Sequence, residues 1–135
     1  MGGAFHLRDI ARLRRIGISA VVDCREEAAD DEEALRRCGI AYLRLPTPDA
    51  RGLSQEALDL GVGWVLQRLH RGEKVLIHCG HGVGRGPLLA CCVLVADGRS
   101  AEDALKLLKT RRWQASPNAE QLAALQEWAG RRGEA

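Results

Sequence analysis

Three apolar runs rich in β-branched residues predict the strands of this chain. Residues 18–24 (ISAVVDC) are almost continuously apolar rather than alternating, which is typical of a parallel strand covered on both faces. Residues 40–45 (IAYLRL) and 74–78 (KVLIH) are the second and third predicted strands. The segment directly after the second strand is predicted as a loop, because Pro46 and Pro48 cannot donate the hydrogen bonds of a paired strand interior.

Apolar residues also recur at helical spacing before, between and after these strands. Ser54 is a predicted N-cap and Gly72 a predicted stop, so a long helix is expected between them. The predicted helices cover residues 7–17, 30–39, 54–71, 86–98 and 100–110, and a last one opens at Pro117. Strands and helices thus alternate, which is typical of an α/β domain with a parallel sheet, helices on both faces and right-handed crossovers.

Composition narrows the classes of function. The 135 residues are 46% apolar and 28% charged, and no repeat or linker divides them, so residues 1–135 are predicted to form one domain with a polar tail from about residue 130. A formal net charge of +2 predicts no nucleic-acid or membrane partner. The sequence contains no apolar run of about 18 residues and no apolar signal segment, so a cytoplasmic location is expected.

The cysteines are read as reduced thiols, because their number is odd and no secretory signal is visible. They are Cys24, Cys38, Cys79, Cys91 and Cys92. No CxxC pair is present, so neither a structural zinc site nor any other cofactor is predicted. Cys38, Cys91 and Cys92 are interpreted as small buried hydrophobic residues.

The segment CGHGVGR (79–85) carries the strongest chemical signal. It connects a predicted strand to a predicted helix, so its backbone N–H groups can converge with those of the helix N-terminus and bind an anion, above all phosphate. Its glycines let the backbone approach a ligand closely, and Arg85 adds a planar fork for two phosphate oxygens. The predicted substrate-binding residues are Gly80, His81, Gly82, Val83, Gly84 and Arg85.

Cys79 is the first residue of this predicted phosphate-binding loop. Helix N-termini and nearby cations favour the thiolate form of a cysteine, and a thiolate beneath a phosphate ester can attack phosphorus. The loop is not a Walker loop, because no Gly-Lys-Ser/Thr follows. The alternative is a glycine-rich turn with a buried cysteine, but the framing of the loop by Cys79 and Arg85 favours catalysis.

The sequence HCGHGVGR (78–85) matches the HCxxGxxR loop of the cysteine-based protein tyrosine phosphatases, and the short chain resembles their small dual-specificity branch. Three further segments, at 21–27, 42–49 and 116–122, are similar to parts of that family. The resemblance implies a dual-specificity-phosphatase-like α/β fold with a central, mostly parallel sheet of four to five strands. Members of the family begin with a further strand, which is expected to be absent or shortened here.

A phosphate monoester with a poor leaving group needs a proton donor. Asp49 follows the second predicted strand, 30 residues before Cys79, where the resemblance places the acid. The same carboxylate would then activate water against a cysteinyl-phosphate. From the local sequence alone, Asp49 is equally well a turn residue after Pro48. Asp23, at the end of the first strand, is the rival carboxylate and is interpreted as a hydrogen-bond acceptor that anchors a loop.

Four further polar residues are candidates for supporting roles. The resemblance implies that His78 orients the loop by hydrogen bonds, whereas His81 either faces the substrate or is a solvated loop residue. Asn118 and Gln121 match positions near the family's site, and Gln121 could position water. The interpretation favoured here is an ordinary asparagine at a helix start and a glutamine on a helix surface.

The chain departs from the family pattern at Gly86, where the motif continues with Ser or Thr. The resemblance implies the loss of a hydroxyl that donates to the sulfur, so hydrolysis of the phosphoenzyme is expected to be slow. Cys24 raises a second hypothesis, because it ends the first predicted strand as Cys79 ends the third. If those strands are neighbours, the two thiols could form a reversible disulfide; the alternative is a core cysteine.

Together these observations predict a metal-independent phosphatase that acts on phosphotyrosine, and through a shallow pocket also on phosphoserine and phosphothreonine. Its partner would be a phosphorylated protein or another phosphomonoester, and a monomer is expected. One alternative is a rhodanese-like domain, which the Gly-Val-Gly-Arg ending and the upstream Pro-Asp disfavour. The others are a phosphate-binding module with weak turnover, suggested by Gly86, and a phosphatase of a phosphoinositide, an RNA 5′-phosphate or a metabolite.

Overall fold

Three parallel strands form the sheet in the order β2-β1-β3. In the computed structural model, which describes residues 7–80 and 83–133, the strands are β1 (Ile18–Arg25), β2 (Ala41–Thr47) and β3 (Lys74–His78). The α/β architecture is confirmed, but the expected four to five strands are not found within these ranges. The chain has three apolar runs of strand length there, and its other regular segments have helical spacing.

Six helices precede, connect and follow the strands in the described part of the chain. They are α1 (Leu7–Arg15), α2 (Glu32–Arg37), α3 (Gln55–His70), α4 (Arg85–Ala96), α5 (Ala101–Arg111) and α6 (Ala119–Gly133). Ser54 caps α3 as predicted, because its side chain accepts a hydrogen bond from Ala57 N. Gly72, with φ at 81°, follows the end of that helix. No helix within the described ranges is both long and apolar enough to cross a membrane.

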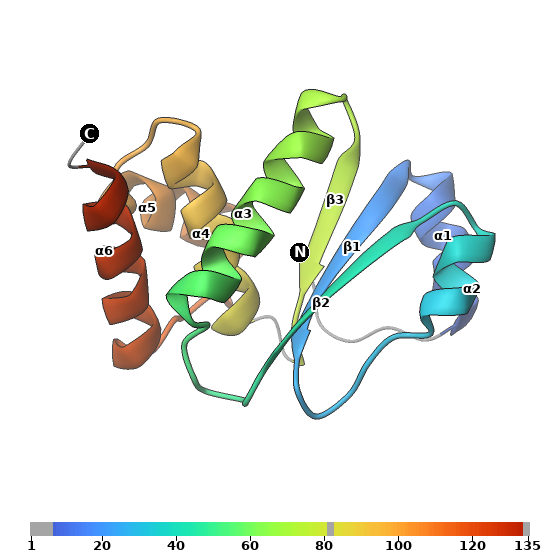
Figure 1. Cartoon of the computed structure of the whole chain (residues 1–135), viewed down its shortest axis with the longest axis horizontal. Coiled ribbons are helices and arrows are strands. Elements are labelled where there is room, and N and C mark those ends of the chain that lie inside the picture. Colours follow the sequence, from blue (N-terminus) through green and yellow to red (C-terminus); the bar gives the residue numbers. More distant parts are fainter. Residues whose placement is uncertain (1–6, 81–82, 134–135) are drawn as a thin grey trace.

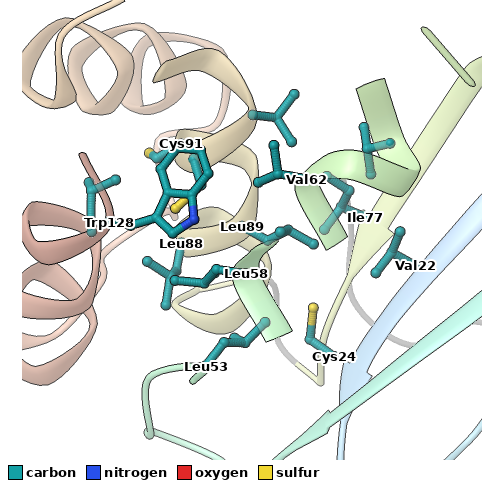
Figure 2. Packing of buried hydrophobic residues seen from close by; sticks show 14 of the residues in the cluster. Val22, Cys24, Leu53, Leu58, Val62, Ile77, Leu88, Leu89, Cys91 and Trp128 are labelled. Atoms are coloured by element: carbon teal, nitrogen blue, oxygen red, sulfur yellow. The ribbon is translucent and has the colours of Figure 1, made fainter. Parts of the chain in front are cut away.

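Helices cover both faces of the sheet, with α1 and α2 on one side and α3 to α6 on the other (Figure 1). Successive residues of β1 serve the two sides. Val21 packs with Ile10 and Leu35 beneath α1 and α2, whereas Val22 and Cys24 belong to the larger cluster under α3 and α4. Figure 2 shows that larger cluster, which continues from the sheet through α4 to Trp128 of α6.

Strand β2 continues two residues further than predicted, through Pro46 to Thr47. The predicted loop start at Pro46 is therefore wrong. β2 is an edge strand, and its register with β1 shifts between Asp23 and Arg25, close to the proline. At an edge and beside an irregularity, a proline costs no ladder hydrogen bond. Helix α6 likewise runs into the predicted polar tail, to Gly133.

The strand register brings the chemical residues to one edge of the sheet. Asp23 of β1 pairs with Arg44 of β2 and with His78 of β3. Because the strands are parallel, their carboxyl ends lie together, and the segments that follow them meet at this edge. The three segments are those that contain Glu27, Asp49 and Cys79.

Candidate active site

Cys79 lies at the end of β3, directly before the loop that leads into α4. Its side chain is buried, and its sulfur accepts a hydrogen bond from the backbone N–H of Gly86 at 3.3 Å. Gly84 is the N-cap residue of α4 and has no side chain to satisfy the first helical N–H groups. The start of α4 therefore directs backbone dipoles toward the sulfur and the space above it.

Arg85 is almost completely buried and is fixed in place by two partners. Its Nη1 and Nη2 donate to the two carboxylate oxygens of Glu27 at 2.7 and 2.8 Å, and Nη1 also donates to Thr47 O at 2.8 Å. The hydrogen bonds with Glu27 raise the pKa of Arg85, against the opposing effect of burial. The same bonds lower the pKa of Glu27 to about 2. The guanidinium thus stays charged and is oriented before any ligand binds.

Sequence reasoning missed Glu27, although a signal was present. Glu26 and Glu27 follow β1 directly, so they lie at the same edge of the sheet as Cys79. A carboxylate at that edge is a natural partner for an otherwise buried arginine. However, Glu27 and Arg85 are 58 positions apart in the sequence, so no local sequence pattern could identify Glu27 as the partner of Arg85.

Asp49 lies in the loop after β2 and is largely exposed. Its Oδ1 is 3.4 Å from Nη2 of Arg85 and accepts a hydrogen bond from Ala50 N at 2.9 Å. Ala50 has φ at 65°, a left-handed conformation that is unfavourable for a residue with a Cβ. The structure thus places the predicted acid beside the predicted phosphate-binding arginine, on a strained loop.

A cavity of about 340 Å³ opens above Cys79. Its walls include Asp49, Arg85, Asn118 and Gln121. These residues come from the loop after β2, the start of α4 and the start of α6, so the fold brings together segments that are distant in the sequence. The cavity has room for a phosphate group and part of the group that carries it.

Gln121 is buried, so its interpretation as a helix-surface residue is wrong. Its side-chain oxygen accepts a hydrogen bond from Asn118 N, and its backbone N donates to Asn118 Oδ1, both at 2.9 Å. The Gln121 amide also packs against Gly84, where an added Cβ would overlap it. Any larger residue at position 84 would therefore have to displace the Gln121 amide from its place against the phosphate-binding loop. Sequence periodicity could not reveal this contact between α6 and the loop.

A buried network of charged groups lies behind the loop. Asp23 accepts hydrogen bonds from Arg25 Nε at 2.9 Å and from the hydroxyl of Tyr42 at 2.7 Å. Burial alone would raise the pKa of Asp23, but the bonds from Arg25 and Tyr42 outweigh it and lower the pKa. His78 Nε2 lies 2.6 Å from Oδ2 of Asp30, the residue that also pairs with Arg25. His78 is thus held firmly next to Cys79.

Asp23, Asp30 and His78 have the residue types of a metal site, and their ligand atoms lie within 4.8 Å of one another. Arg25 already bridges the two carboxylates, with Nε on Asp23 and Nη2 on Asp30 at 2.8 Å. To bind here, a metal cation would have to displace the Arg25 guanidinium, which already neutralises the two carboxylates. The cluster is therefore better described as an internal ion-pair network.

Cys24 and Cys79 follow directly after the register partners Asp23 and His78 on neighbouring strands. Burial, reinforced by the charges of Cys79 and Asp23, raises the pKa of Cys24 well above its usual range. Cys91 and Cys92 are buried as predicted, whereas Cys38 is only partly buried.

The remaining predicted binding residues lie in the loop itself. At Gly80 an added Cβ would lie 3.0 Å from Glu27 Oε2 and 3.1 Å from Arg85 Nη2, so this glycine makes room for the ion pair. Val83 is partly exposed, and its carbonyl oxygen accepts a hydrogen bond from Ser116 N at 2.7 Å. His81 and Gly82 lie outside the described residues.

Comparison with known proteins agrees with this geometry. The chain is 26% identical over 121 residues to mouse protein tyrosine phosphatase type IVA 3, with 88% of this chain and 69% of the relative covered. It is 28% identical over 124 residues to human dual specificity protein phosphatase 2, with 87% and 37% covered. The chain therefore spans little more than a third of the second relative.

Solved structures share the fold. The crystal structure of Tk-PTP in the active form superposes with a TM-score of 0.89 at 30% identity, covering 96% of this chain and 89% of that one. The structure of PTPMT1 in complex with PI(5)P gives a TM-score of 0.90 at 23% identity, with 98% and 91% covered, which shows the fold alone.

The model of the family described as "Dual specificity phosphatase, catalytic domain" matches residues 2–131. This match spans nearly the whole chain and includes every segment that meets at the candidate site. The predicted resemblance to cysteine-based phosphatases is confirmed, and the chain belongs to the dual specificity phosphatase catalytic domain family.

Proposed function

We propose that the chain hydrolyses phosphotyrosine, and also phosphoserine and phosphothreonine, in proteins through a cysteinyl-phosphate intermediate without a metal ion. The observation that carries this proposal is the convergence of Cys79, Arg85 and Asp49 on one cavity. A sulfur nucleophile, a charged fork for phosphate and a carboxylate at the cavity wall are the groups that such a reaction needs.

The substrate phosphate would bind at the start of α4, where backbone N–H groups and Arg85 meet it. Glu27 engages the Nη1–Nη2 end of the guanidinium, which leaves the Nε–Nη2 edge to hold two phosphate oxygens. The Cys79 thiolate then attacks phosphorus, the S–P bond forms, and the bond to the leaving oxygen breaks. Asp49 donates a proton to that oxygen, so that an alcohol or phenol departs rather than its anion.

In the second step, water replaces the sulfur on phosphorus. Asp49, now ionised, accepts a proton from the attacking water, and the S–P bond breaks to release phosphate and the thiolate. The Gly86 N–H stabilises the departing sulfur. The position of Gln121 in the cavity wall supports a role for its side chain in holding this water. Its Nε2 also donates a hydrogen bond to Arg51 O at 3.1 Å.

The test is hydrolysis of phenyl phosphate and of a phosphotyrosine peptide, with EDTA and a reductant present. Wild type is expected to turn over both, and Cys79→Ser neither. Cys38→Ser is the matched control, because Cys38 is partly buried on the far side of the sheet, against α1 and α2. Equal activity of Cys79→Ser and wild type would overturn the proposal.

A second candidate, a phosphate-binding module with weak turnover, is favoured by Gly86 alone. The same experiment separates it from the enzyme. Binding of vanadate without measurable turnover in wild type would support the module, and multiple turnovers would exclude it.

We further propose that the chain acts as a cytoplasmic monomer. Five free cysteines, four of them buried in the core, support a reducing compartment. Light scattering in the presence of a reductant would test the monomer, and a mass near twice 14.7 kDa would contradict it.

A further inference from the structure

The loop that carries Asp49 is fastened to the start of α6. Three side chains at this end of α6 form hydrogen bonds with the backbone of three consecutive loop residues. The bonds run from Asn118 Nδ2 to Ala50 O (2.6 Å), from Gln121 Nε2 to Arg51 O (3.1 Å), and from Gly52 N to Glu120 Oε2 (2.6 Å). The position of the loop therefore depends on α6 and not only on strand β2.

The loop has reason to need such fastening. Asp49 is 68% exposed, so packing does not hold its side chain. Ala50, next to it, has the left-handed φ of 65°, which a free loop would tend to relax. If Ala50 relaxed, the Asp49 carboxylate would lose its place 3.4 Å from Nη2 of Arg85.

Of the three fastening side chains, Glu120 is the one whose role can be isolated. Asn118 and Gln121 also bond to each other across the first turn of α6, so replacing either would disturb the helix start. Glu120 is about half exposed, and its Oε2 also lies 3.2 Å from Nε of Arg51. Its bonds thus go to the loop, through one backbone N–H and one loop side chain.

We propose that Glu120 is a positioning residue for the proton donor: it binds Gly52 N, with Arg51 as its counterion, and thereby holds the loop that places Asp49 at the cavity. This inference rests on the proposed role of Asp49. It concerns a residue that would not itself touch the substrate, so its signature must be sought in the proton-transfer step.

That step has a distinctive readout. A proton donor accelerates departure of a poor leaving group such as phenol and adds little for a good one such as 2,4-dinitrophenol. The test is therefore to measure kcat/KM, which reports formation of the phosphoenzyme, for phenyl phosphate and for 2,4-dinitrophenyl phosphate. In Glu120→Ala, kcat/KM is expected to fall about tenfold for phenyl phosphate and to stay within about twofold for the dinitrophenyl ester.

Conservative and matched variants separate positioning from a general structural effect. Glu120→Gln keeps an acceptor oxygen for Gly52 N but loses the charge that pairs with Arg51, so its loss with phenyl phosphate is expected to be smaller, about threefold. A second cavity, of about 790 Å³, has both Glu120 and Glu127 in its wall. Glu127→Ala is the control, because Glu127 lies two turns further along α6 than Glu120. It should match wild type with both esters.

Asp49→Asn distinguishes failure of this inference from failure of the proposed function. It should lower kcat/KM for phenyl phosphate by roughly 10²- to 10³-fold and leave the dinitrophenyl ester much less affected. If Asp49→Asn shows no such selectivity, the proposed acid role fails. If Asp49→Asn shows it but Glu120→Ala affects both esters equally, or neither, the positioning role of Glu120 is overturned.

Discussion

The backbone N–H of Gly86 donates to the sulfur of Cys79 at 3.3 Å. At this position the family motif has Ser or Thr, whose hydroxyl is expected to donate to the same sulfur. The sulfur takes up negative charge whenever the S–P bond breaks, and each donor directed at it lowers the energy of that charge. Here a backbone donor is present, but the hydroxyl is missing.

Gly86→Ser is therefore expected to accelerate hydrolysis of the phosphoenzyme, by about tenfold. In rapid-mixing experiments wild type should show a burst of phenol close to one equivalent of enzyme, followed by slow steady turnover. The variant should show a smaller burst and a higher kcat, with kcat/KM nearly unchanged because the first step is not altered. A hydrolysis rate that is the same in both proteins would contradict the role assigned to this position.

The ion pair of Glu27 and Arg85 predicts a pH-dependent stability. The pKa of Glu27 is lowered from 4.5 to about 2, so the folded state holds this carboxylate ionised where the unfolded chain would protonate it. The contribution of this ion pair to the free energy of unfolding is complete above pH 4.5 and disappears as the pH falls toward 2. Urea unfolding of wild type and Glu27→Gln should differ at pH 6, by about 1 kcal/mol or less because Glu27 is half exposed, and converge as the pH is lowered.

Glu26→Gln is the control, since Glu26 precedes Glu27 and its side chain has no part in the ion pair. This variant keeps the Glu27–Arg85 ion pair and should therefore lose stability between pH 6 and pH 3 as wild type does. Glu27→Gln should also lower kcat/KM by roughly tenfold, because Arg85 would lose the partner that orients it. A constant difference between wild type and Glu27→Gln from pH 6 to pH 3 would show that the ion pair contributes nothing in solution.

Much of the fold could be predicted because its strands are nearly continuous apolar runs. The prediction of strand 18–24 differs from β1 by one residue, and that of 74–78 coincides with β3. The end of β2 was misplaced because the rule on proline applies to strand interiors, and whether a strand is at an edge is settled only by the assembled sheet. Within residues 7–80 and 83–133 the strands are fewer than predicted, because the predicted number came from the family resemblance and not from apolar runs in this sequence.

Some residues of the site could be predicted from local sequence motifs, whereas others are revealed only by contacts between segments that are distant in the sequence. Cys79, Arg85 and Asp49 belong to short motifs or lie at a strand end, so their meeting at one edge could be expected. Glu27 and Glu120 act through contacts over 58 and 68 sequence positions, and nothing in their immediate neighbours points to those contacts. Long-range partners of this kind require the fold itself.

The neighbouring strands β1 and β3 make a Cys24–Cys79 disulfide geometrically feasible. Cys24 and Cys79 directly follow the last paired residues, Asp23 and His78. The spacing of about 4.8 Å between neighbouring strands lies within the range of about 4.4–6.8 Å between disulfide Cα atoms. Because burial raises the pKa of Cys24, we expect peroxide to oxidise Cys79 first to the sulfenic acid. The Cys24 thiol then attacks that sulfur and water leaves. Peptide mapping after mild peroxide should detect the linked peptides.

Loss of this partner should change the fate of Cys79. After peroxide, wild type is expected to regain activity with dithiothreitol, whereas Cys24→Ser should be inactivated irreversibly through the sulfinic acid. Cys38→Ser should behave like wild type, because Cys38 packs on the opposite face of the sheet. Absence of the linked peptide, together with equal recovery of all three proteins, would leave Cys24 as a core residue only.

Two glycines of α3 predict opposite effects of the same substitution. At Gly61 an added Cβ would lie 2.8 Å from Leu45 Cδ1 and 2.9 Å from Leu89 Cδ1, and both leucines are buried and cannot easily move. Gly61→Ala should therefore lower the free energy of unfolding by about 1–3 kcal/mol. At Gly63 the added Cβ would have no heavy atom within 4 Å in the described structure other than those of the adjacent residues and the backbone of its own helix.

Gly63→Ala should raise the free energy of unfolding by about 0.5–1 kcal/mol, because alanine in a helix interior loses less conformational entropy on folding. The two positions are in one helix, so a general effect of helix propensity would move both variants in the same direction. Urea unfolding at fixed pH with a reductant measures both differences. Stabilisation by Gly61→Ala would mean that α3 does not approach β2 and α4 as closely as these contacts require.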